Sequence, residues 1–209
     1  MTVRNLNLAA ELLLAAQVFV LALVLARVEL VLLPVTADFG GGIQIAEVNL
    51  GAATLVLLVF SAACRAAAVR WATPVIRWVE WSQVSAIVVF LVAQLNGVRD
   101  VAALVALYAL TAGASLFLVL HERAGAVVWP FSFGAAVGIV PWGVIAFYQV
   151  GAIAIGDDPS FVVRAVTIVM LLASAAYWYV SRALMSERAH TTLVVLLASA
   201  FAWLSVLAG

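Results

Sequence analysis

Long apolar runs, separated by short clusters of charged and turn-forming residues, occur seven times along the chain. A helix needs roughly 20 apolar residues to cross the hydrocarbon core of a bilayer. The runs therefore predict seven membrane-spanning helices, over residues 8–30, 50–69, 75–95, 101–120, 129–152, 161–180 and 191–207. Because the intervening connections are short, consecutive helices should be antiparallel neighbours. We expect an all-α membrane protein with a single seven-helix transmembrane domain over residues 1–209, located as a multi-pass protein in the cell membrane.

The composition supports a membrane protein and excludes several other classes. Apolar residues make up 67% of the chain and charged residues 10%, against about 45–50% and about 25% in soluble domains. A formal net charge of +0 leaves no basic surface for nucleic acid. With a single cysteine, Cys64, neither an internal disulfide nor a cysteine metal cage can form. We expect no metal site and no enzyme, since no metal-binding or nucleophile motif is present.

All ten basic residues are arginines, so the chain contains no lysine. If the seven spans alternate in direction, one side of the membrane receives Arg4, Arg65, Arg70, Arg77, Arg123, Arg182 and Arg188, and the other receives Arg27, Arg99 and Arg164. Basic residues favour the cytoplasmic side. We therefore expect a cytoplasmic amino terminus and an extracellular carboxyl terminus. The alternative, a signal peptide cleaved after Ala26, is disfavoured because Glu11 and Gln17 interrupt its apolar run.

Two segments carry a resemblance to a known family. The third span begins Arg77-Trp78-Val79-Glu80-Trp81-Ser82, and the fifth contains Pro130-Phe131-Ser132-Phe133-Gly134 and Gly138-Ile139-Val140-Pro141-Trp142. With seven spans and a cytoplasmic amino terminus, the chain resembles the heliorhodopsins, retinal proteins that are inverted relative to other microbial rhodopsins. In that family the third helix usually begins Arg-Trp-x-Glu-Tyr-Ser. The resemblance covers essentially the whole chain and implies a rhodopsin-like fold and a homodimer.

The residue that binds retinal in that family is missing. Heliorhodopsins hold retinal through a lysine of the seventh helix, in the pattern Ala-Lys-Ser-Ala-x-Ala-Trp, and Ala198 stands at that position here. An imine requires a primary amine, so covalent retinal attachment inside the bundle is chemically unavailable. Other expected polar residues are also replaced: Leu14 and Arg65 stand where the family commonly has histidines, and Val194 stands where it has a serine.

Glu80 remains, and by resemblance it would be the counterion of the retinal Schiff base. The resemblance implies a pocket formed by Glu80, Trp81, Ser85, Trp142, Ala198 and Trp203. A carboxylate within a membrane span usually faces the bundle interior and has a partner. We expect a polar network of Glu11, Arg65, Arg77 and Glu80, in which Arg65 supplies the positive charge that a lysine would otherwise provide.

Three alternatives to the Arg65–Glu80 pair remain open. Glu80 could pair with Arg77, three positions earlier on the same helical face, or stay neutral through burial. Arg65 could instead extend to the lipid headgroups.

The small side chain of Ala198 leaves an unfilled volume, which Phe201 is the candidate to fill. A filled slot predicts no ligand there, and an open slot predicts water or a noncovalent lipophilic guest.

These residues favour a heliorhodopsin-like membrane protein that cannot form a retinal Schiff base. It would act as a sensory, regulatory or partner-binding module in the lipid bilayer, with an unidentified protein partner and a noncovalent lipophilic ligand. One alternative is a photoreceptor that binds retinal or another polyene noncovalently. A second is a small proton or solute transporter that uses Glu80 with Arg65 and Glu11.

Overall fold

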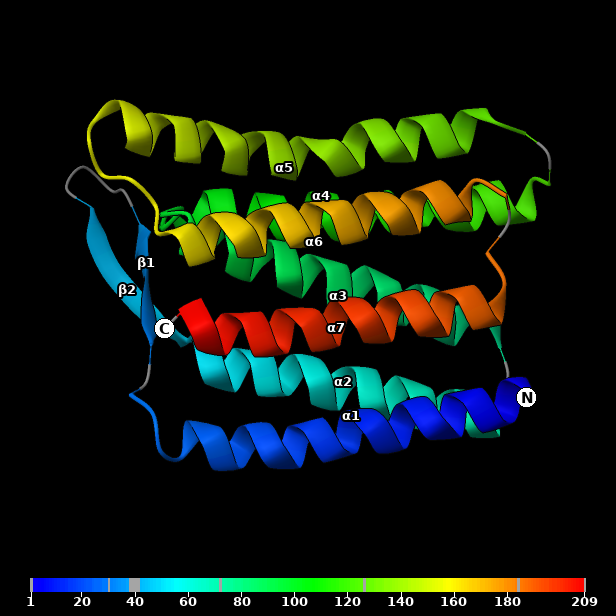
Figure 1. The fold of residues 1–209 in the computed structure, drawn as a ribbon. Coiled ribbons are helices and arrows are strands. Elements are labelled where there is room, and N and C mark those ends of the chain that lie inside the picture. Colours follow the sequence, from blue (N-terminus) through cyan, green and yellow to red (C-terminus); the bar gives the residue numbers. More distant parts are fainter. Residues whose placement is uncertain are drawn as a thin grey trace.

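The computed structural model describes residues 2–29, 31–37, 42–71, 73–125, 127–183 and 185–208. Within these residues the chain forms α1 (Val3–Leu25), α2 (Leu50–Arg70), α3 (Pro74–Leu95), α4 (Val101–Arg123), α5 (Trp129–Ala154), α6 (Phe161–Ser181) and α7 (Glu187–Ala208). All seven helices are long and apolar enough to span a membrane. They alternate in direction within one bundle, with the two ends of the chain at opposite ends of it (Figure 1). We call these ends the N-side and the C-side.

The helices agree with the predicted spans except at some ends. Helix α1 begins five residues before the predicted start because the Thr2 side chain accepts a hydrogen bond from the Asn5 backbone and caps it. It ends at Leu25, short of the predicted residue 30, and Leu30 itself lies outside the described residues. Helix α7 begins at Glu187, four residues before the predicted start, because the charged residues that precede the apolar run are also helical.

The expectation of helices alone is incomplete, because a β-hairpin connects α1 to α2. Its strands, β1 (Leu32–Ala37) and β2 (Ile43–Asn49), pair antiparallel on the C-side. The backbone N–H of Thr36 donates to the Arg99 carbonyl at 2.8 Å, which joins β1 to the connection between α3 and α4. The hairpin lies across the ends of the helices (Figure 1). Asp38, which the sequence places in this connection, lies outside the described residues.

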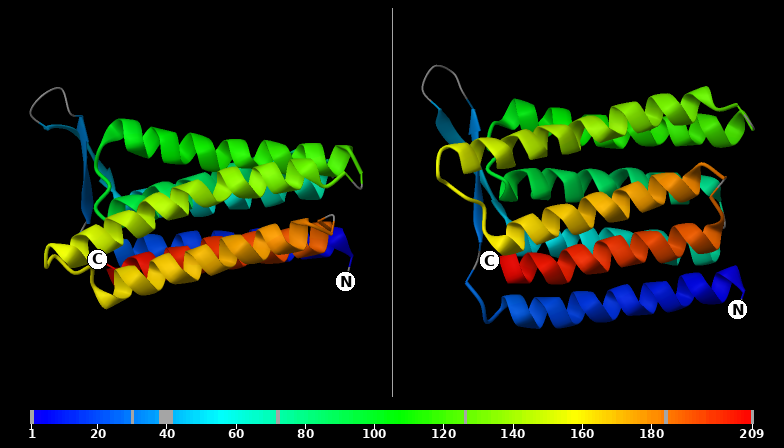
Figure 2. Two further views of the ribbon diagram at one scale, coloured as in Figure 1. Left: turned by 90° about the horizontal axis from the view of Figure 1, so that it is seen from above. Right: turned by 45° about the horizontal axis from the view of Figure 1, so that its top comes forward.

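Helix α3 occupies the centre of the bundle. It packs against α2, α4, α5, α6 and α7, and its Val84, Val88 and Val92 are fully buried. Helix α5 lies at the edge and packs mainly on α4, as the two further views also show (Figure 2). Side chains that α3 directs inward are therefore enclosed by neighbouring helices.

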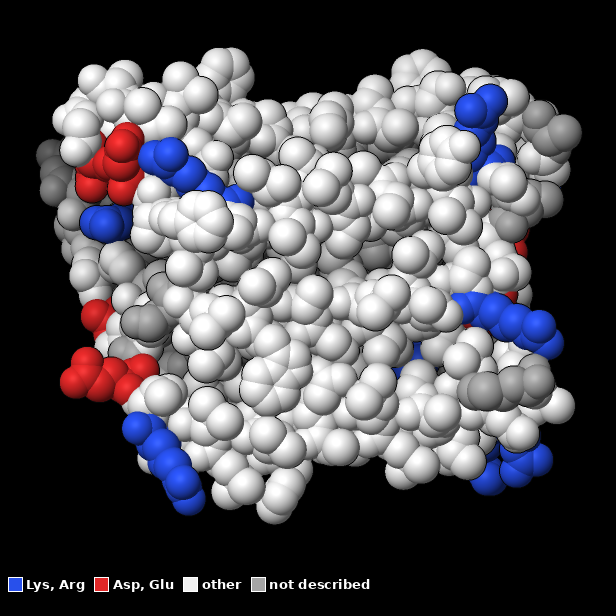
Figure 3. Space-filling view, in the orientation of Figure 1, with Lys and Arg blue, Asp and Glu red and all other residues white. Residues whose placement is uncertain are grey.

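The outer surface shows where the bilayer lies. In the view of Figure 3 the acidic and basic side chains gather at the two ends of the molecule, with a broad uncharged belt between them. Large apolar side chains such as Phe19, Leu116 and Phe147 are exposed along the helices. In a membrane protein such side chains face lipid, so this belt is the surface in contact with the bilayer.

Candidate functional site: a buried polar network

An arginine and a glutamate face each other inside the N-side half of the bundle. Arg65 comes from α2 and Glu80 from α3, and both side chains are 0% exposed. Nε of Arg65 donates to Oε1 of Glu80 at 3.1 Å, and Nη2 of Arg65 donates to Oε2. The hydroxyl of Ser61, one turn before Arg65, donates to Oε1 of Glu80 at 2.7 Å. This bidentate arrangement matches guanidinium to carboxylate geometry and neutralises both charges locally.

A histidine and a tyrosine complete the surroundings of Glu80. Nε2 of His190, on α7, lies 2.9 Å from Oε2 of Glu80 and 3.1 Å from Nη2 of Arg65. The imidazole can therefore donate to the carboxylate or accept from the guanidinium, depending on which ring nitrogen carries the proton. The hydroxyl of Tyr177, on α6, lies 2.8 Å from Nδ1 of His190. Since a hydroxyl both donates and accepts, Tyr177 satisfies this nitrogen in either case.

The remaining donor group of Arg65 is bound by α1 and α7. Nη1 of Arg65 donates to Oδ1 of Asn7 at 3.2 Å and to Oγ1 of Thr191 at 2.8 Å. The Thr191 hydroxyl in turn donates to Oδ1 of Asn7 at 2.9 Å. Side chains from α1, α2, α3, α6 and α7 thus meet in one network. A buried ion pair is tolerated when hydrogen bonds satisfy its remaining polar atoms, and this pair has such bonds.

The structure brings together some of the predicted network residues and separates others. The contact expected between Arg65 and Glu80 is present, and Arg65 does not reach the headgroups because it is fully buried. The alternative pairing of Arg77 with Glu80 is wrong: Arg77 binds Glu122 of α4 and Glu187 of α7. Glu11 is half-buried and forms no ion pair or hydrogen bond with another described residue, so it does not belong to the network.

Sequence reasoning missed most of the residues that surround the ion pair. His190, Tyr177, Ser61 and Thr191 were not predicted, because single polar residues in apolar helices have no pattern of their own. The depth of each residue along its membrane span was the signal that could have found them. His190 lies three residues after the start of α7, on the same side of the membrane as the end of α2 and the start of α3. Residues at equal depth in neighbouring helices are candidates for contact.

The predicted retinal pocket is closed. Three of its residues, Trp81, Ser85 and Trp142, line a cavity of about 10 Å³, which is about the minimum for one water molecule. Trp142 also lines a cavity of about 200 Å³ between α5 and α6, whose lining includes no other predicted pocket residue. Both are smaller than ligand pockets, which measure about 300–1,000 Å³. The indole of Trp81 stacks on the ring of Tyr177 with 3.3 Å between ring centroids. The Ser85 hydroxyl donates to the Trp81 carbonyl at 2.6 Å and is therefore already occupied by backbone.

The two predicted pocket residues of α7 lie elsewhere. Ala198 is fully buried in the apolar core, together with Phe201 one turn later. Eight residues separate it from His190, or about 12 Å along the helix axis. Since Glu80 contacts His190, Ala198 lies nearer the C-side than the ion pair. The prediction for Trp203 is wrong, since its side chain is 40% exposed on the outer surface.

The comparisons with known proteins identify the chain's family. No curated protein matches it. The heliorhodopsin family profile matches residues 3–208, a range that contains all seven helices and every residue of the buried network. The chain therefore belongs to the heliorhodopsin family.

Proposed function

We propose that this protein is a membrane-embedded sensory or regulatory module that works without covalently bound retinal. The observation that carries the proposal is that Glu80 is already paired with other side chains, in a chain that has no lysine. A carboxylate that serves as counterion must face the cation of the pigment. Here both oxygens of Glu80 are occupied by Arg65, Ser61 and His190. The arginine takes the electrostatic role that a protonated imine would have.

The residues present do not fit retinal at the family's usual position. Ala198 offers no amine, and the space of about 10 Å³ beside Trp81, Ser85 and Trp142 is too small for a polyene. The same volume argues against the alternative of a photoreceptor that holds a polyene noncovalently in this slot. A lipophilic ligand would have to bind elsewhere in the molecule.

The contacts of Glu80 also argue against a proton or solute transporter. A relay needs a carboxylate that can exchange its proton and a second group to receive it. Four polar contacts from three residues, Arg65, Ser61 and His190, hold Glu80 in place, and Glu11 makes none of them. The network instead joins five helices through one charge pair, an arrangement suited to reporting a shift of one helix to the others.

The proposal includes what family membership suggests about assembly and orientation. We propose a homodimer, a cytoplasmic amino terminus and an unidentified protein partner. The distribution of arginines supports the orientation, because seven of the ten lie towards the N-side.

Adding all-trans-retinal to the purified protein tests the proposal. We expect no red-shifted absorption band and no retinal fixed to the polypeptide by borohydride, because no interior amine is available. A heliorhodopsin that carries the lysine, treated in parallel, shows that the reagents work. Retinal fixed at an interior site of the unaltered protein would contradict the proposal.

The variant Ala198→Lys distinguishes two reasons why no pigment forms, the missing amine and the closed slot. We expect that this variant still forms no red-shifted pigment, because the slot is closed and Glu80 is already paired with Arg65. A red-shifted band in this variant would show that the lysine alone is missing, and would contradict the closed slot.

A further inference from the structure

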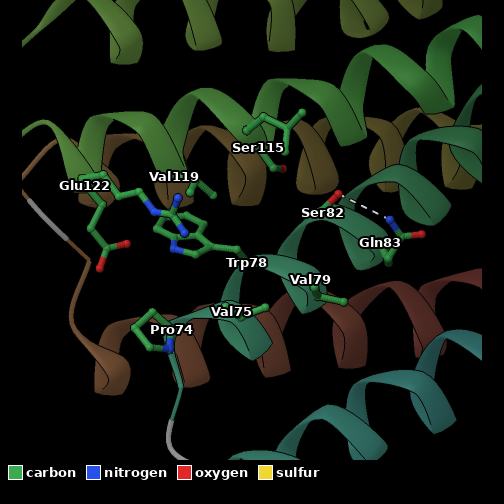
Figure 4. Close-up of a pocket in the computed structure, with 11 residues that line it drawn as sticks. Pro74, Val75, Trp78, Val79, Ser82, Gln83, Ser115, Val119 and Glu122 are labelled. Atoms are coloured by element: carbon green, nitrogen blue, oxygen red, sulfur yellow. Dashed lines mark hydrogen bonds between the residues drawn. The ribbon is translucent and has the colours of Figure 1, made fainter.

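A cleft of about 470 Å³ lies between α3 and α4 in the N-side half of the bundle. Its lining consists of Pro74, Val75, Trp78, Val79, Ser82 and Gln83 of α3 and Ser115, Leu116, Val119, Glu122 and Arg123 of α4. The spacing within each set places the residues on one helical face, so the two faces form opposite walls (Figure 4). Val75, Val79 and Leu116 are exposed on the outer surface. The cleft is therefore accessible from the lipid, and its volume suits a small molecule.

The middle of the cleft is apolar. Trp78 is 9% exposed, and the neighbouring wall residues are Val75, Val79, Leu116 and Val119. Figure 4 shows Trp78 between the α3 and α4 walls. A flat or elongated hydrocarbon body fits such a lining, since apolar walls with one aromatic face are typical of sites for lipophilic ligands.

The inner end of the cleft carries polar groups with unused hydrogen-bonding capacity. The Ser115 hydroxyl is buried and has no hydrogen-bond partner among the described residues. In Figure 4 it points from α4 towards α3. The Gln83 carbonyl oxygen accepts from the Tyr108 hydroxyl, and the Gln83 amide nitrogen Nε2 donates one hydrogen to Ser82 Oγ at 3.4 Å. The free groups are thus the Ser115 hydroxyl, which can donate or accept, and the second Gln83 N–H, which can only donate.

A ligand that satisfies these groups must present an acceptor, and that acceptor must be neutral. Ser82 lies eight residues after Pro74, or about 12 Å from the N-side end of α3. An anion at that depth is costly without a cation beside it. The guanidinium of Arg77 is already bound to Glu122 and Glu187. Arg123 is the last residue of α4 and lies eight residues, or about 12 Å along the helix axis, from Ser115. A carbonyl oxygen meets both requirements.

We propose that the cleft between α3 and α4 binds a neutral, lipid-soluble carbonyl compound of the quinone or ketone class. Its carbonyl oxygen accepts from Ser115 and Gln83, its ring or chain packs on Trp78, and it enters from the bilayer past Val79. The inference rests on the proposed noncovalent ligand binding and gives that ligand a site separate from the closed retinal slot.

Binding of a tritium-labelled decyl-benzoquinone to the protein in lipid nanodiscs tests this site. We expect saturable binding at one site, absent from empty nanodiscs. Val79→Trp fills the entrance and should weaken binding at least tenfold. The matched control Val105→Trp adds the same side chain at an exposed position of α4 outside the cleft, and should leave binding unchanged.

Two further measurements test the carbonyl. Ser115→Ala removes one donor and should weaken binding about 2- to 12-fold, the range for one neutral hydrogen bond, with unchanged helicity and elution volume. Decylbenzene, which lacks the carbonyl, should compete at least fivefold more weakly than the quinone. Equal competition would show a site for hydrocarbon alone and overturn the proposal, as would a Ser115→Ala variant that binds as well as the unaltered protein.

Binding that is no greater than in empty nanodiscs, or that Val79→Trp does not change, would overturn the site itself. These outcomes are independent of the retinal experiment. If the protein forms a Schiff base with retinal but still binds the quinone, only the proposed function is contradicted. If it forms no Schiff base and binds no quinone, only the proposed binding site in the cleft is contradicted.

Discussion

Glu80 is stable as a buried carboxylate only because its partners are in place. The side chain is 0% exposed and has hydrogen-bond or ionic contacts from α2 and α7. Removing one member of a buried ion pair leaves an uncompensated charge, which costs about 3–5 kcal/mol. Removing both charges together avoids this penalty. The two substitutions should therefore not be independent.

We expect Arg65→Leu and Glu80→Gln each to lower the free energy of unfolding by about 3 kcal/mol or more, and the double variant to lose less than the sum of the two. Unfolding in mixed micelles, followed by circular dichroism, measures all three. Arg164→Leu is the control: its pair with Asp158 is largely exposed, so its effect should stay below about 1 kcal/mol. Strictly additive losses would contradict a direct pair.

Part of this site follows from the sequence. Arg65 lies near the end of one span and Glu80 near the start of the next, so their equal depth predicts the contact that the structure shows. The orientation of a side chain around its helix is harder to predict. Trp203 follows Ala198 by five residues, which is about 140° around an α-helix, and it therefore points outward while Ala198 points inward.

At the scale of elements, a glycine allows the edge helix α5 to pack close against α4. A Cβ added at Gly134 would lie 2.6 Å from Cβ of Phe117 and 2.9 Å from the Trp178 ring. Cβ of Phe117 is fixed to the α4 backbone and cannot turn away. Any side chain at position 134 therefore forces α5 away from α4.

We expect Gly134→Ala to lower the free energy of unfolding by about 1–3 kcal/mol through overpacking. Gly143→Ala, on the same helix, is the matched control because an added Cβ there has no atom within 4 Å. Its higher helix propensity should leave stability unchanged or raise it by up to about 1 kcal/mol. Thermal unfolding of the two variants side by side gives the comparison. An equal effect at both positions would show that close packing at Gly134 is not the cause.

The helices were predictable from the apolar runs alone, and the hairpin was not. Its strands have only 6 and 7 residues, and Pro34 with the following glycines is as typical of a loop as of a hairpin. What stabilises β1 is a tertiary contact, the hydrogen bond from Thr36 to the Arg99 carbonyl. Pairing between residues more than 60 positions apart has no local signature in the sequence.

At the scale of the whole molecule, the distribution of arginines is the argument for the proposed orientation in the membrane. Two of the seven N-side arginines, Arg65 and Arg77, are themselves buried and form ion pairs with glutamates. The other five are exposed at that end of the bundle. The excess over the C-side therefore persists when the buried arginines are left out, which supports a cytoplasmic N-side.

Single-cysteine labelling in intact cells tests this orientation. In a Cys64→Ser background, we expect a membrane-impermeant maleimide to label Asp157→Cys, in the exposed connection between α5 and α6. It should not label Ala183→Cys, in the exposed connection between α6 and α7. Both should be labelled once the membrane is permeabilised. The reverse pattern in intact cells would place the amino terminus outside.

The hairpin ties neighbouring helices together on the C-side. Through Thr36 it fastens the α1–α2 pair to the α3–α4 pair. On the N-side, Arg77 joins α3 to Glu122 of α4 and to Glu187 of α7, and the charge pair of Arg65 and Glu80 joins α2 to α3. Polar contacts thus cross-link the bundle at both ends, so a displacement of one helix is passed on to its neighbours and is not absorbed at a loose end.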